Sequence, residues 1–401
     1  MNSILLISVI VTGIAFLIWL YLIFLRGRFW CTDIQLRLPD FQDADMKDWP
    51  LVCVIIPARN EAETIPDTIP NLLHQEYPGT FHVFLVDDGS SDGTGELAES
   101  ISRKRNASGH FSVVSGKPLQ KDWTGKLWAL RQGIQASRHL KPKFYLFTDA
   151  DIRHPPVILR TLVCKAEKEQ LDLVSLMVKL NASTFWEKVL IPAFVFFFSK
   201  LYPFRWVNTR NRHEAAAAGG CILIRETALS QTGGLERLSS ALIDDIALAR
   251  QIKKADGSIW LGLTQNLTSL RSYNGLRGVW HMVSRTAYSQ LHYSPILLML
   301  TVLGMTLIYL MPPVSSIFGI AYLMLNGVSA AGFGCAVLGS MTWFIMSLSF
   351  RPMLRWYEIS ARYAPLLPVA GLLYTLMTID SAIRHYRGKG GAWKGRIYNR
   401  L

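Results

Sequence analysis

Apolar runs of two different lengths alternate with polar segments along this 401-residue chain. Residues 4–25 carry no charged side chain and are long enough to cross a bilayer, which takes about 20 helical residues. Residues 286–350 contain no Asp, Glu, Lys or Arg over 65 positions, which leaves room for two or three crossings. A further apolar segment covers residues 363–383. The pattern predicts an N-terminal anchor and a C-terminal group of membrane helices.

Prolines and charges predict how these apolar segments are arranged. Pro312 and Pro313 predict a break between two C-terminal crossings. Arg26 and Arg28 follow the first segment, and the tail is strongly basic, so the positive-inside rule places both in the cytosol. A cytosolic domain between them then requires two or four C-terminal crossings, and the charges do not decide which. A signal peptide is the alternative for the first segment, but no positive charge precedes its apolar core.

Shorter apolar runs rich in β-branched residues occupy the middle of the chain. Residues 51–57, 81–86 and 144–148 are typical of strands that are buried on both faces of a sheet. Helix-like patterns alternate with them, which predicts an α/β fold with a Rossmann-like, mostly parallel sheet. Ligands of such sheets bind beyond the carboxyl ends of the strands. Further strands are expected near residues 111–114, 171–178, 215–224 and 257–271.

The chain is expected to comprise an anchor, a linker, an α/β domain, membrane-embedded helices and a basic cytosolic tail, at residues 1–28, 29–50, 51–290, 291–383 and 384–401. The α/β domain includes two segments, near 184–206 and 275–290, that we expect at the membrane interface. The first is dense in aromatic residues with basic ones between them, which favours an in-plane helix with its apolar face in lipid. A buried core helix is the alternative.

Composition favours lipid as the surface that this chain contacts. The formal net charge is +13, and half of the residues are apolar. A basic, apolar chain indicates either nucleic acid or anionic lipid as a partner. The basic residues flank apolar segments and do not form one aromatic-laced patch, which disfavours nucleic acid. The five cysteines are scattered without a C-x-x-C pair, so neither a disulfide framework nor a zinc site is expected.

Two carboxylates one residue apart end the strand at 144–148. Asp149 and Asp151 share a face if the chain stays extended, so both point at one place just past the strand. Their hard oxygen atoms suit Mg²⁺ or Mn²⁺, which completes its coordination shell with phosphate oxygens and water. A simple turn at the strand exit is the alternative, because Asp is common in turns.

Other polar residues at strand ends and helix starts suit a nucleotide-sugar. Asp87 and Asp88 can hydrogen-bond a base or ribose, and Lys126 near a helix start favours phosphate. A capped loop and an exposed surface lysine are the alternatives. No G-x-G-x-x-G follows the first strand, which argues against a dinucleotide site.

A second acidic pair, Asp244 and Asp245, opens a predicted helix. Asp245 is the candidate general base, with an ordinary pKa, and simple helix capping is the alternative. Four further residues are candidates for the acceptor side. Gly219 and Gly220 permit close backbone approach to a ligand, while Trp280 and His281 either line an acceptor site or belong to an interfacial helix.

Taken together, these motifs resemble the family-2 glycosyltransferases of GT-A fold. The matching stretches stand in the family's order at 57–61, 87–94, 125–126, 149–151 and 244–250. More narrowly, the chain is similar to the hopene-associated glycosyltransferases (HpnB). That likeness is carried by Gln120 to Lys126, by Asp149 to His154, by the apolar C-terminal block, and by the ending from Asp380 to Arg384 and Trp393 to Arg396.

The resemblance implies an enzyme of the bacterial inner membrane with a cytosolic catalytic domain. It would transfer one sugar, with inversion, from a UDP-sugar to a hydroxyl group of a hopanoid or related lipid. Asp245, or Asp244 beside it, would be the base, and Asp149 and Asp151 would position the donor and its divalent metal. The Gln-x-x-Arg-Trp motif of processive members is missing, which favours a single transfer. The residues implied in nucleotide binding are Pro57, Ala58, Arg59, Asn60, Glu61, Asp87, Asp88, Lys126 and Asp149.

Three rival hypotheses stay open at this point. The same catalytic domain can act on polyprenyl phosphate or build a polysaccharide. A membrane scaffold can keep the fold without catalysis, although it has no need of Asp151 and Asp245 together. The third hypothesis, nucleic-acid binding, is suggested by the net charge alone. Neither the sugar nor the oligomeric state follows from the sequence.

Overall fold

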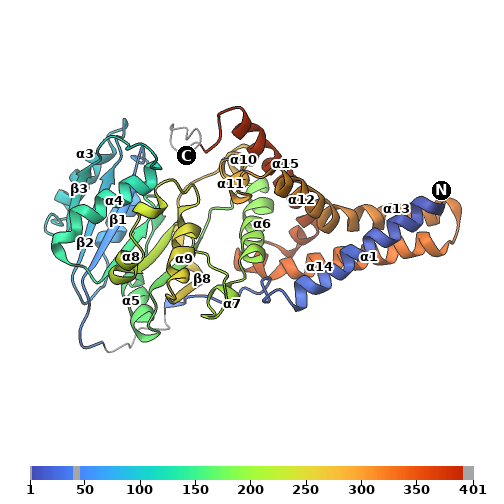
Figure 1. Cartoon of the computed structure of the whole chain (residues 1–401), viewed down its shortest axis with the longest axis horizontal. Helices are drawn as coiled ribbons and strands as arrows, with labels where there is room; N and C mark the ends of the chain where they lie inside the picture. The colour runs from blue at the N-terminus through green and yellow to red at the C-terminus, as the bar shows by residue number, and fades with distance from the viewer. Residues whose placement is uncertain (1, 39–45, 392–401) are drawn as a thin grey trace. The chain divides into compact units, whose positions relative to one another are not determined.

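The structure is a computed structural model that describes residues 2–38 and 46–391, and its chain forms two compact units (Figure 1). The sheet unit comprises residues 34–181 and 206–272, and the helical unit comprises residues 2–33, 182–205 and 273–390. The interfacial segments near 184–206 and 275–290 therefore cluster with the apolar helices, whereas the sequence pattern placed them in the α/β domain.

The sheet unit contains an eight-stranded mixed sheet with strand order β3-β2-β1-β4-β7-β6-β8-β5. The first four strands in this order are parallel, β7 is antiparallel to both of its neighbours, and β5 is antiparallel to β8. Six of the eight strands therefore share one direction, which confirms the mostly parallel α/β fold. The strands are β1 Val52–Ala58, β2 Phe81–Asp87, β3 Phe111–Ser115, β4 Phe144–Thr148, β5 Ile152–Arg153, β6 Leu173–Lys179, β7 Cys221–Arg225 and β8 Ile259–Ser269.

Helices cover both faces of this sheet, because the central strands are apolar on both sides. Every residue of β1 is buried, and its alternate residues Val52, Val54 and Ile56 belong to the core shared with α2 and α5. The opposite face of β1 packs against α4, where Gly133 allows close approach. A Cβ atom at Gly133 would lie 2.4 Å from Ile55 Cγ2. The helices of this unit are α2 Ile65–Leu73, α3 Thr94–Lys104, α4 Gly125–Ser137, α5 Ile158–Lys168, α8 Glu226–Gln231 and α9 Asp244–Lys254.

The reversed strand β7 brings a distant segment to the carboxyl edge of the sheet. Thr148, the last residue of β4, pairs with Cys221, the first residue of β7. The Thr148 hydroxyl also donates to the Gly220 carbonyl oxygen at 2.9 Å. Gly219 and Gly220 therefore lie beside the residues that follow β4. The linker also joins this sheet, because Leu36 and Leu263 are connected by a backbone hydrogen bond of 2.9 Å.

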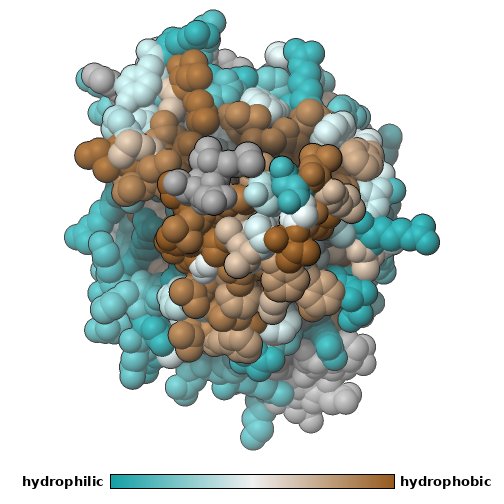
Figure 2. All heavy atoms as spheres, turned by 90° about the vertical axis from the view of Figure 1, so that its right-hand side faces the viewer, coloured by the Kyte–Doolittle hydropathy of each residue, from teal (hydrophilic) through white to brown (hydrophobic). Residues whose placement is uncertain are grey.

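The helical unit consists of long apolar helices, and α1, α13 and α14 run side by side in it (Figure 1). Apolar side chains cover most of the face at the α13–α14 end (Figure 2), where Met324, Leu325 and Val328 are exposed. The elements are α1 Asn2–Phe24, α6 Phe185–Leu201, α10 Leu276–Ser284, α11 Ala287–Gln290, α12 Pro295–Met305, the π-helical turn η4 Thr306–Leu310, α13 Met311–Asn326, α14 Ala330–Trp356, the 3₁₀ helix η5 Ala361–Leu366 and α15 Leu367–Tyr386.

Four stretches of the described chain are long and apolar enough to cross a membrane: Leu5–Phe24, Pro295–Asn326, Ala330–Trp356 and Ala361–Tyr386. The break that we expected at Pro312 and Pro313 is absent from the described helices, so this prediction was wrong. The π-helical turn η4 shifts the hydrogen-bond pattern just before them, so both prolines fall in the first turn of α13, where proline is tolerated. The chain reverses instead at Gly327, whose φ is +81°.

The described part of the chain contains three candidate crossings after the sheet unit, where we expected two or four. The third candidate stays helical because Pro365 lies in η5 and Pro368 in the first turn of α15. An odd number of crossings would place the tail and the sheet unit on opposite sides of the membrane. Most of the tail, including the stretch from Trp393 to Arg396, lies outside the described residues.

Helix α6 is mostly covered by protein rather than by lipid, which corrects our expectation of an in-plane helix. Its apolar side chains pack against α10, α14 and α15, and Phe185 and Leu201 at its two ends are exposed. Glu187 in its first turn is fully buried. Its carboxylate accepts hydrogen bonds from Ser183, Thr184 and the Gly275 amide. Burial alone would raise the pKa of Glu187, but these bonds outweigh burial and lower the pKa to about 2.

Candidate active site

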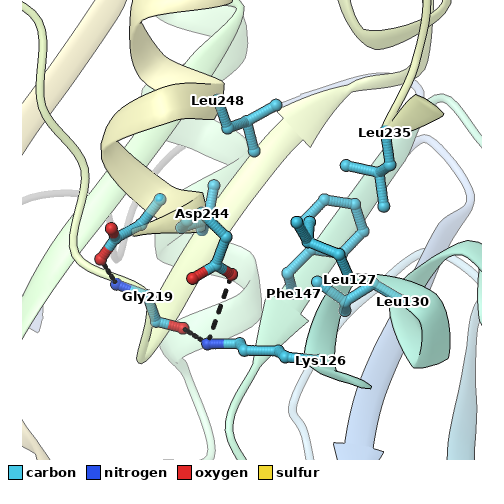
Figure 3. Close-up of a pocket in the computed structure, with 10 residues that line it drawn as sticks. Lys126, Leu127, Leu130, Phe147, Gly219, Leu235, Asp244 and Leu248 are labelled. Atoms are coloured by element: carbon cyan, nitrogen blue, oxygen red, sulfur yellow. Dashed lines mark hydrogen bonds and ion pairs between the residues drawn. The ribbon is translucent and has the colours of Figure 1, made fainter. Parts of the chain in front are cut away.

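Lys126 lies at the centre of an acidic cluster at the carboxyl edge of the sheet. It is the second residue of α4, and its Nζ atom lies 2.7 Å from Asp149 Oδ1 and 3.8 Å from Asp244 Oδ2. Figure 3 shows Lys126 pointing toward Asp244 and the Gly219 carbonyl oxygen, which lies 3.4 Å from Nζ. Burial lowers the pKa of Lys126, but Asp149 and Asp244 outweigh burial and raise it above its ordinary value. Lys126 therefore remains a cation that links two predicted site carboxylates.

Asp245 is held in a partly desolvated position by backbone amides. The Gly219 N–H donates to Oδ2 and the Ile246 N–H donates to Oδ1, both at 2.8 Å. Burial raises the pKa of Asp245, the charge of Asp244 raises it further, and Lys126 opposes both, which leaves a pKa of about 7. We expected an ordinary carboxylate pKa at this position. The higher value arises because Asp244, Asp245 and Lys126 share one small pocket.

The site leaves little space for a side chain at Gly219. A Cβ atom at this position would lie 3.0 Å from Lys126 Nζ and 3.2 Å from Asp245 Oδ2. The Gly219 backbone therefore lies close to the side chains of Lys126 and Asp245. Gly220 instead packs on the sheet, since a Cβ atom there would lie 3.0 Å from Val178 Cγ2.

Asp151 is buried beside Asp149 and is held by residues at the end of β8. Its Oδ2 atom accepts a hydrogen bond of 2.8 Å from the Ser269 hydroxyl and lies 3.8 Å from Arg271 Nε. Burial and the charge of Asp149 raise the pKa of Asp151, and Arg271 opposes them. A buried carboxylate beside a second, half-exposed one is a donor set that a divalent cation would stabilise.

The protein would supply only part of the coordination shell of such a cation. Within the described residues, no group of three or more His, Cys, Asp or Glu side chains is arranged to hold a metal ion. Mg²⁺ and Mn²⁺ commonly bind through one or two carboxylates together with substrate phosphates and water. Asp149 and Asp151 therefore fit a cation that arrives with a diphosphate.

Arg271 is a site residue that the sequence analysis missed. It follows β8 and lies between two predicted site carboxylates, with Nη2 3.6 Å from Glu61 Oε1 and Nε 3.8 Å from Asp151 Oδ2. Its side chain is 40% exposed, whereas those of Glu61 and Asp151 are 12% and 11% exposed. Arg271 therefore presents a positive charge to solvent above two buried acids. The antiparallel pairing of β8 with β5, in which Ser269 lies opposite Ile152, places it beside Asp151.

We expect Arg271→Gln to change metal and nucleotide binding in opposite directions. Removing the cation beside Asp151 should tighten binding of Mn²⁺ alone by a few-fold, because a competing positive charge is lost. Removing a guanidinium from the site should weaken binding of a nucleoside diphosphate about tenfold, as expected for one charge-assisted hydrogen bond. Electron paramagnetic resonance of free Mn²⁺ and calorimetry with the nucleotide measure the two effects.

Arg103→Gln is the matched control, because Arg103 is an exposed arginine on α3 of the same unit. It should leave both affinities unchanged. A loss of Mn²⁺ affinity in Arg271→Gln would contradict the role assigned to Arg271.

The loops after β1 and β2 are joined into one structure by polar side chains. Arg59 Nη1 donates to the carbonyl oxygens of Asp88 and Gly89, the latter at 3.0 Å. Asn60 accepts from the Ser91 N–H at 2.9 Å, and its own N–H donates to the Ser90 hydroxyl oxygen at 3.0 Å. The two loops therefore form one continuous surface at the carboxyl edge of the sheet.

The predicted nucleotide-binding residues occupy different places on this surface. Pro57 and Ala58 are buried at the end of β1, so only their backbone is placed near the edge. The Asp87 carboxylate accepts from the Ser90 N–H at 2.9 Å and thereby shapes its own loop. Asp88 is buried, and its N–H donates to the Ala58 carbonyl oxygen at 2.8 Å. Ligand contacts by these residues remain a prediction.

Trp280 and His281, the predicted acceptor-side pair, lie on α10 in the helical unit. Trp280 Nε1 donates to Asp380 Oδ2 at 2.8 Å, and Arg384 Nε donates to the same oxygen at 2.7 Å. These contacts join α10 to α15. The Trp280 N–H is therefore engaged within the helical unit, and its role toward an acceptor remains a prediction.

Comparison with known proteins identifies the class to which this site belongs. Residues 53–233, a little under half of the chain, match the family described as Glycosyl transferase family 2. This segment matches the family that the motifs predicted, and it contains Lys126, Asp149, Asp151 and Gly219. The match does not extend to the narrower likeness to hopene-associated enzymes.

Three individual proteins give more detail. The chain is 36% identical over 100 residues to the glycosyltransferase AglJ of Haloferax volcanii, which is 25% of this chain and 27% of that protein. It is 30% identical over 125 residues to an undecaprenyl-phosphate 4-deoxy-4-formamido-L-arabinose transferase of Salmonella choleraesuis, which is 31% of this chain and 35% of that protein. The chain therefore spans about a quarter to a third of these curated relatives.

The third is a solved structure, the mannosyltransferase PcManGT from Pyrobaculum calidifontis in complex with GDP-Man and Mn²⁺. It superposes on this chain with a TM-score of 0.51 and covers 95% of this chain and 98% of its own, at 18% sequence identity. This likeness establishes the fold.

Proposed function

We propose that this protein is a membrane-bound glycosyltransferase that moves one sugar from a nucleotide-sugar to a hydroxyl group of a hydrophobic lipid. The donor we favour is a UDP-sugar, and the acceptor we favour is a hopanoid or related isoprenoid alcohol. The family-2 domain, the acidic cluster around Lys126 and the four candidate membrane helices support this proposal. The membrane we favour is the bacterial inner membrane, with the sheet unit in the cytosol.

The observation that carries the proposal is the environment of Asp245. A hydroxyl group needs a base to take its proton as the new bond to sugar forms, and a general base works best with a pKa near the operating pH. Asp245, with a pKa of about 7, has that property. Its two amide donors orient the carboxylate, so one oxygen lone pair can face the acceptor.

The neighbouring residues suit the departing nucleoside diphosphate. Asp149 and Asp151 would hold the divalent cation, which neutralises charge on the diphosphate when it is bound. Lys126 lies beside Asp149 and can transfer its ion pair to a phosphate oxygen as negative charge develops there. PcManGT was solved with a nucleotide-sugar and Mn²⁺, which agrees with this assignment.

The rate of transfer should depend on pH through Asp245. The base must be deprotonated, so the rate should fall about tenfold per pH unit below pH 7 and level off above it. Asp244→Asn removes the charge that raises the pKa of Asp245, so the same limb should move to lower pH. Initial rates at saturating donor between pH 5 and pH 9 measure both profiles. A flat profile in the wild type would contradict the role of Asp245.

A polyprenyl phosphate is the second candidate acceptor. The Salmonella relative, by its name, acts on undecaprenyl phosphate, although the match covers about a third of it. A phosphate group is already largely ionised at pH 7 and needs no base, so Asp245 favours the hydroxyl acceptor.

The test offers both acceptor classes to the purified full chain in detergent, with a panel of labelled UDP- and GDP-sugars and Mn²⁺. When the isoprenoid alcohol is the acceptor, the labelled sugar should appear in the organic phase, in a product that carries one sugar. Transfer to polyprenyl phosphate alone would replace the first acceptor by the second, and products with many sugars would contradict a single transfer.

A further inference from the structure

The helical unit carries most of the net positive charge of the chain. Its residues include 13 Lys and Arg against four Asp and Glu, an excess of nine, whereas the whole chain has an excess of 13. Two of its carboxylates, Asp33 and Asp380, pair with Arg205 and Arg384. A cation of this unit that forms no ion pair with a described carboxylate is therefore a candidate to bind an anion.

Lys200 is such a cation, and it lies among aromatic rings near the C-terminal end of α6. Its Nζ atom donates to the Tyr309 hydroxyl oxygen at 2.9 Å and lies 4.6 Å from the centre of that ring and 5.4 Å from the ring of Phe197. Among the described residues, Lys200 forms no ion pair with a carboxylate. One neutral hydroxyl group thus satisfies one of its three N–H donors.

A second cation, Arg26, is held at the same end of α6. Its Nε atom donates to the Lys200 carbonyl oxygen at 3.2 Å, and Nη2 donates to the Leu201 carbonyl oxygen at 3.3 Å. Burial lowers the pKa of Lys200, and the charge of Arg26 lowers it further, to about 8. Two cations thus lie close enough to repel each other, and a bound anion would relieve both the repulsion and the desolvation.

The position of this pair along the chain indicates a membrane boundary. Arg26 follows the candidate span Leu5–Phe24 by two residues. Tyr309, whose hydroxyl oxygen accepts from Lys200, lies within the candidate span Pro295–Asn326 and contacts the ring of Trp19 on the first span, with 5.7 Å between ring centres. Aromatic residues gather at the level of lipid headgroups, and ionisable residues at membrane depth commonly mark functional sites.

We propose that Lys200 and Arg26 form a binding site for the phosphate group of a lipid. A phosphate accepts charge-assisted hydrogen bonds from both an ammonium and a guanidinium group, and its acyl or prenyl chain can lie on the exposed apolar helices. The remaining two N–H donors of Lys200 supply the direct contacts. This site does not depend on the proposed sugar transfer, because the lipid would bind there without a nucleotide.

Two sources can supply this phosphate. A phosphomonoester lipid, such as a polyprenyl phosphate, would be a substrate of the second candidate reaction. A phosphodiester lipid, such as phosphatidylglycerol, would be a resident membrane lipid. Both have the same contacts to Lys200 and Arg26, and the monoester carries the larger charge.

The test is native mass spectrometry of the detergent-solubilised full chain, titrated with undecaprenyl phosphate and, separately, with phosphatidylglycerol. Lys200→Gln should weaken binding about tenfold, as expected for one charge-assisted hydrogen bond, and Lys200→Arg should stay within about threefold of the wild type. Lys188→Gln is the matched control, because it removes a lysine from the other end of the same helix. Binding of undecaprenol, which lacks the phosphate, should be unchanged by Lys200→Gln.

The outcomes separate a specific site from general attraction of a basic protein to anionic lipid. Loss with Lys200→Gln and not with Lys188→Gln supports the site, and the lipid that shows the larger loss identifies its source. The proposal would be overturned if Lys200→Gln and Lys188→Gln lost lipid affinity equally, or if Lys200→Gln left the affinity unchanged. It would also be overturned if Lys200→Arg lost as much affinity as Lys200→Gln.

Discussion

Asp245→Asn should abolish nearly all sugar transfer while leaving donor binding intact. The amide has the same shape and can still accept a hydrogen bond from the Gly219 N–H, so the pocket should keep its geometry. It cannot take a proton, and loss of a general base costs about a hundredfold to ten-thousandfold in rate. Initial rates of label transfer and calorimetry with the nucleotide measure the two properties separately.

Asp244→Asn is the control that decides between the two adjacent acids. Asp244 lies 3.8 Å from Lys126, and its carboxylate contributes charge to the cluster. If Asp245 is the base, Asp244→Asn should keep activity within about tenfold of the wild type and move the pH profile to lower pH. A severe loss in Asp244→Asn with near-normal turnover in Asp245→Asn would transfer the role of base to Asp244.

Asp151→Ala should remove metal-dependent binding of the nucleotide. Asp151 is buried, lies beside Asp149 and is oriented by Ser269. Loss of a residue that merely supports a metal ligand commonly costs about 10–100-fold in affinity, so loss of a ligand should cost at least that. Titration of free Mn²⁺ by electron paramagnetic resonance, with and without UDP, measures this loss.

Asp67→Ala is a suitable comparison, because Asp67 is an exposed aspartate on α2 of the same unit. It should bind Mn²⁺ and UDP as the wild type does. Asp151→Asn tests whether a change in fold explains the loss, because the amide keeps the shape and one weak oxygen ligand. Wild-type Mn²⁺ affinity in both Asp151 variants would show that the cation binds elsewhere.

The sequence predicts the fold of the sheet unit well, because its signals are local. Runs such as Val52–Ala58 are apolar at nearly every position, which is typical of strands with helices on both faces. Parallel strands then bring their carboxyl ends to one edge, so the sequence alone could assign Arg59, Asp87 and Asp149 to one site. The family resemblance could be recognised because the acidic motifs occur in the same order as in that family.

Other features depend on contacts between residues far apart in the sequence, which local patterns do not contain. Arg271 reaches Asp151 because β8 pairs with β5, and the raised pKa of Asp245 reflects a pocket that it shares with Lys126 from α4. The course of the chain at Pro312 depended on a π-helical turn, which has no clear sequence signal. The burial of α6 depended on three helices that follow it by about 80 residues or more.

The most direct test is calorimetric titration of the detergent-solubilised wild-type chain with UDP and with GDP, each with and without Mn²⁺. Asp149, Asp151 and Lys126 together predict that UDP binds when Mn²⁺ is present and binds far more weakly without it. Preference for GDP would change the donor and keep the mechanism. If neither nucleotide binds under any condition, the chain is not an active glycosyltransferase, and the scaffold hypothesis would take its place.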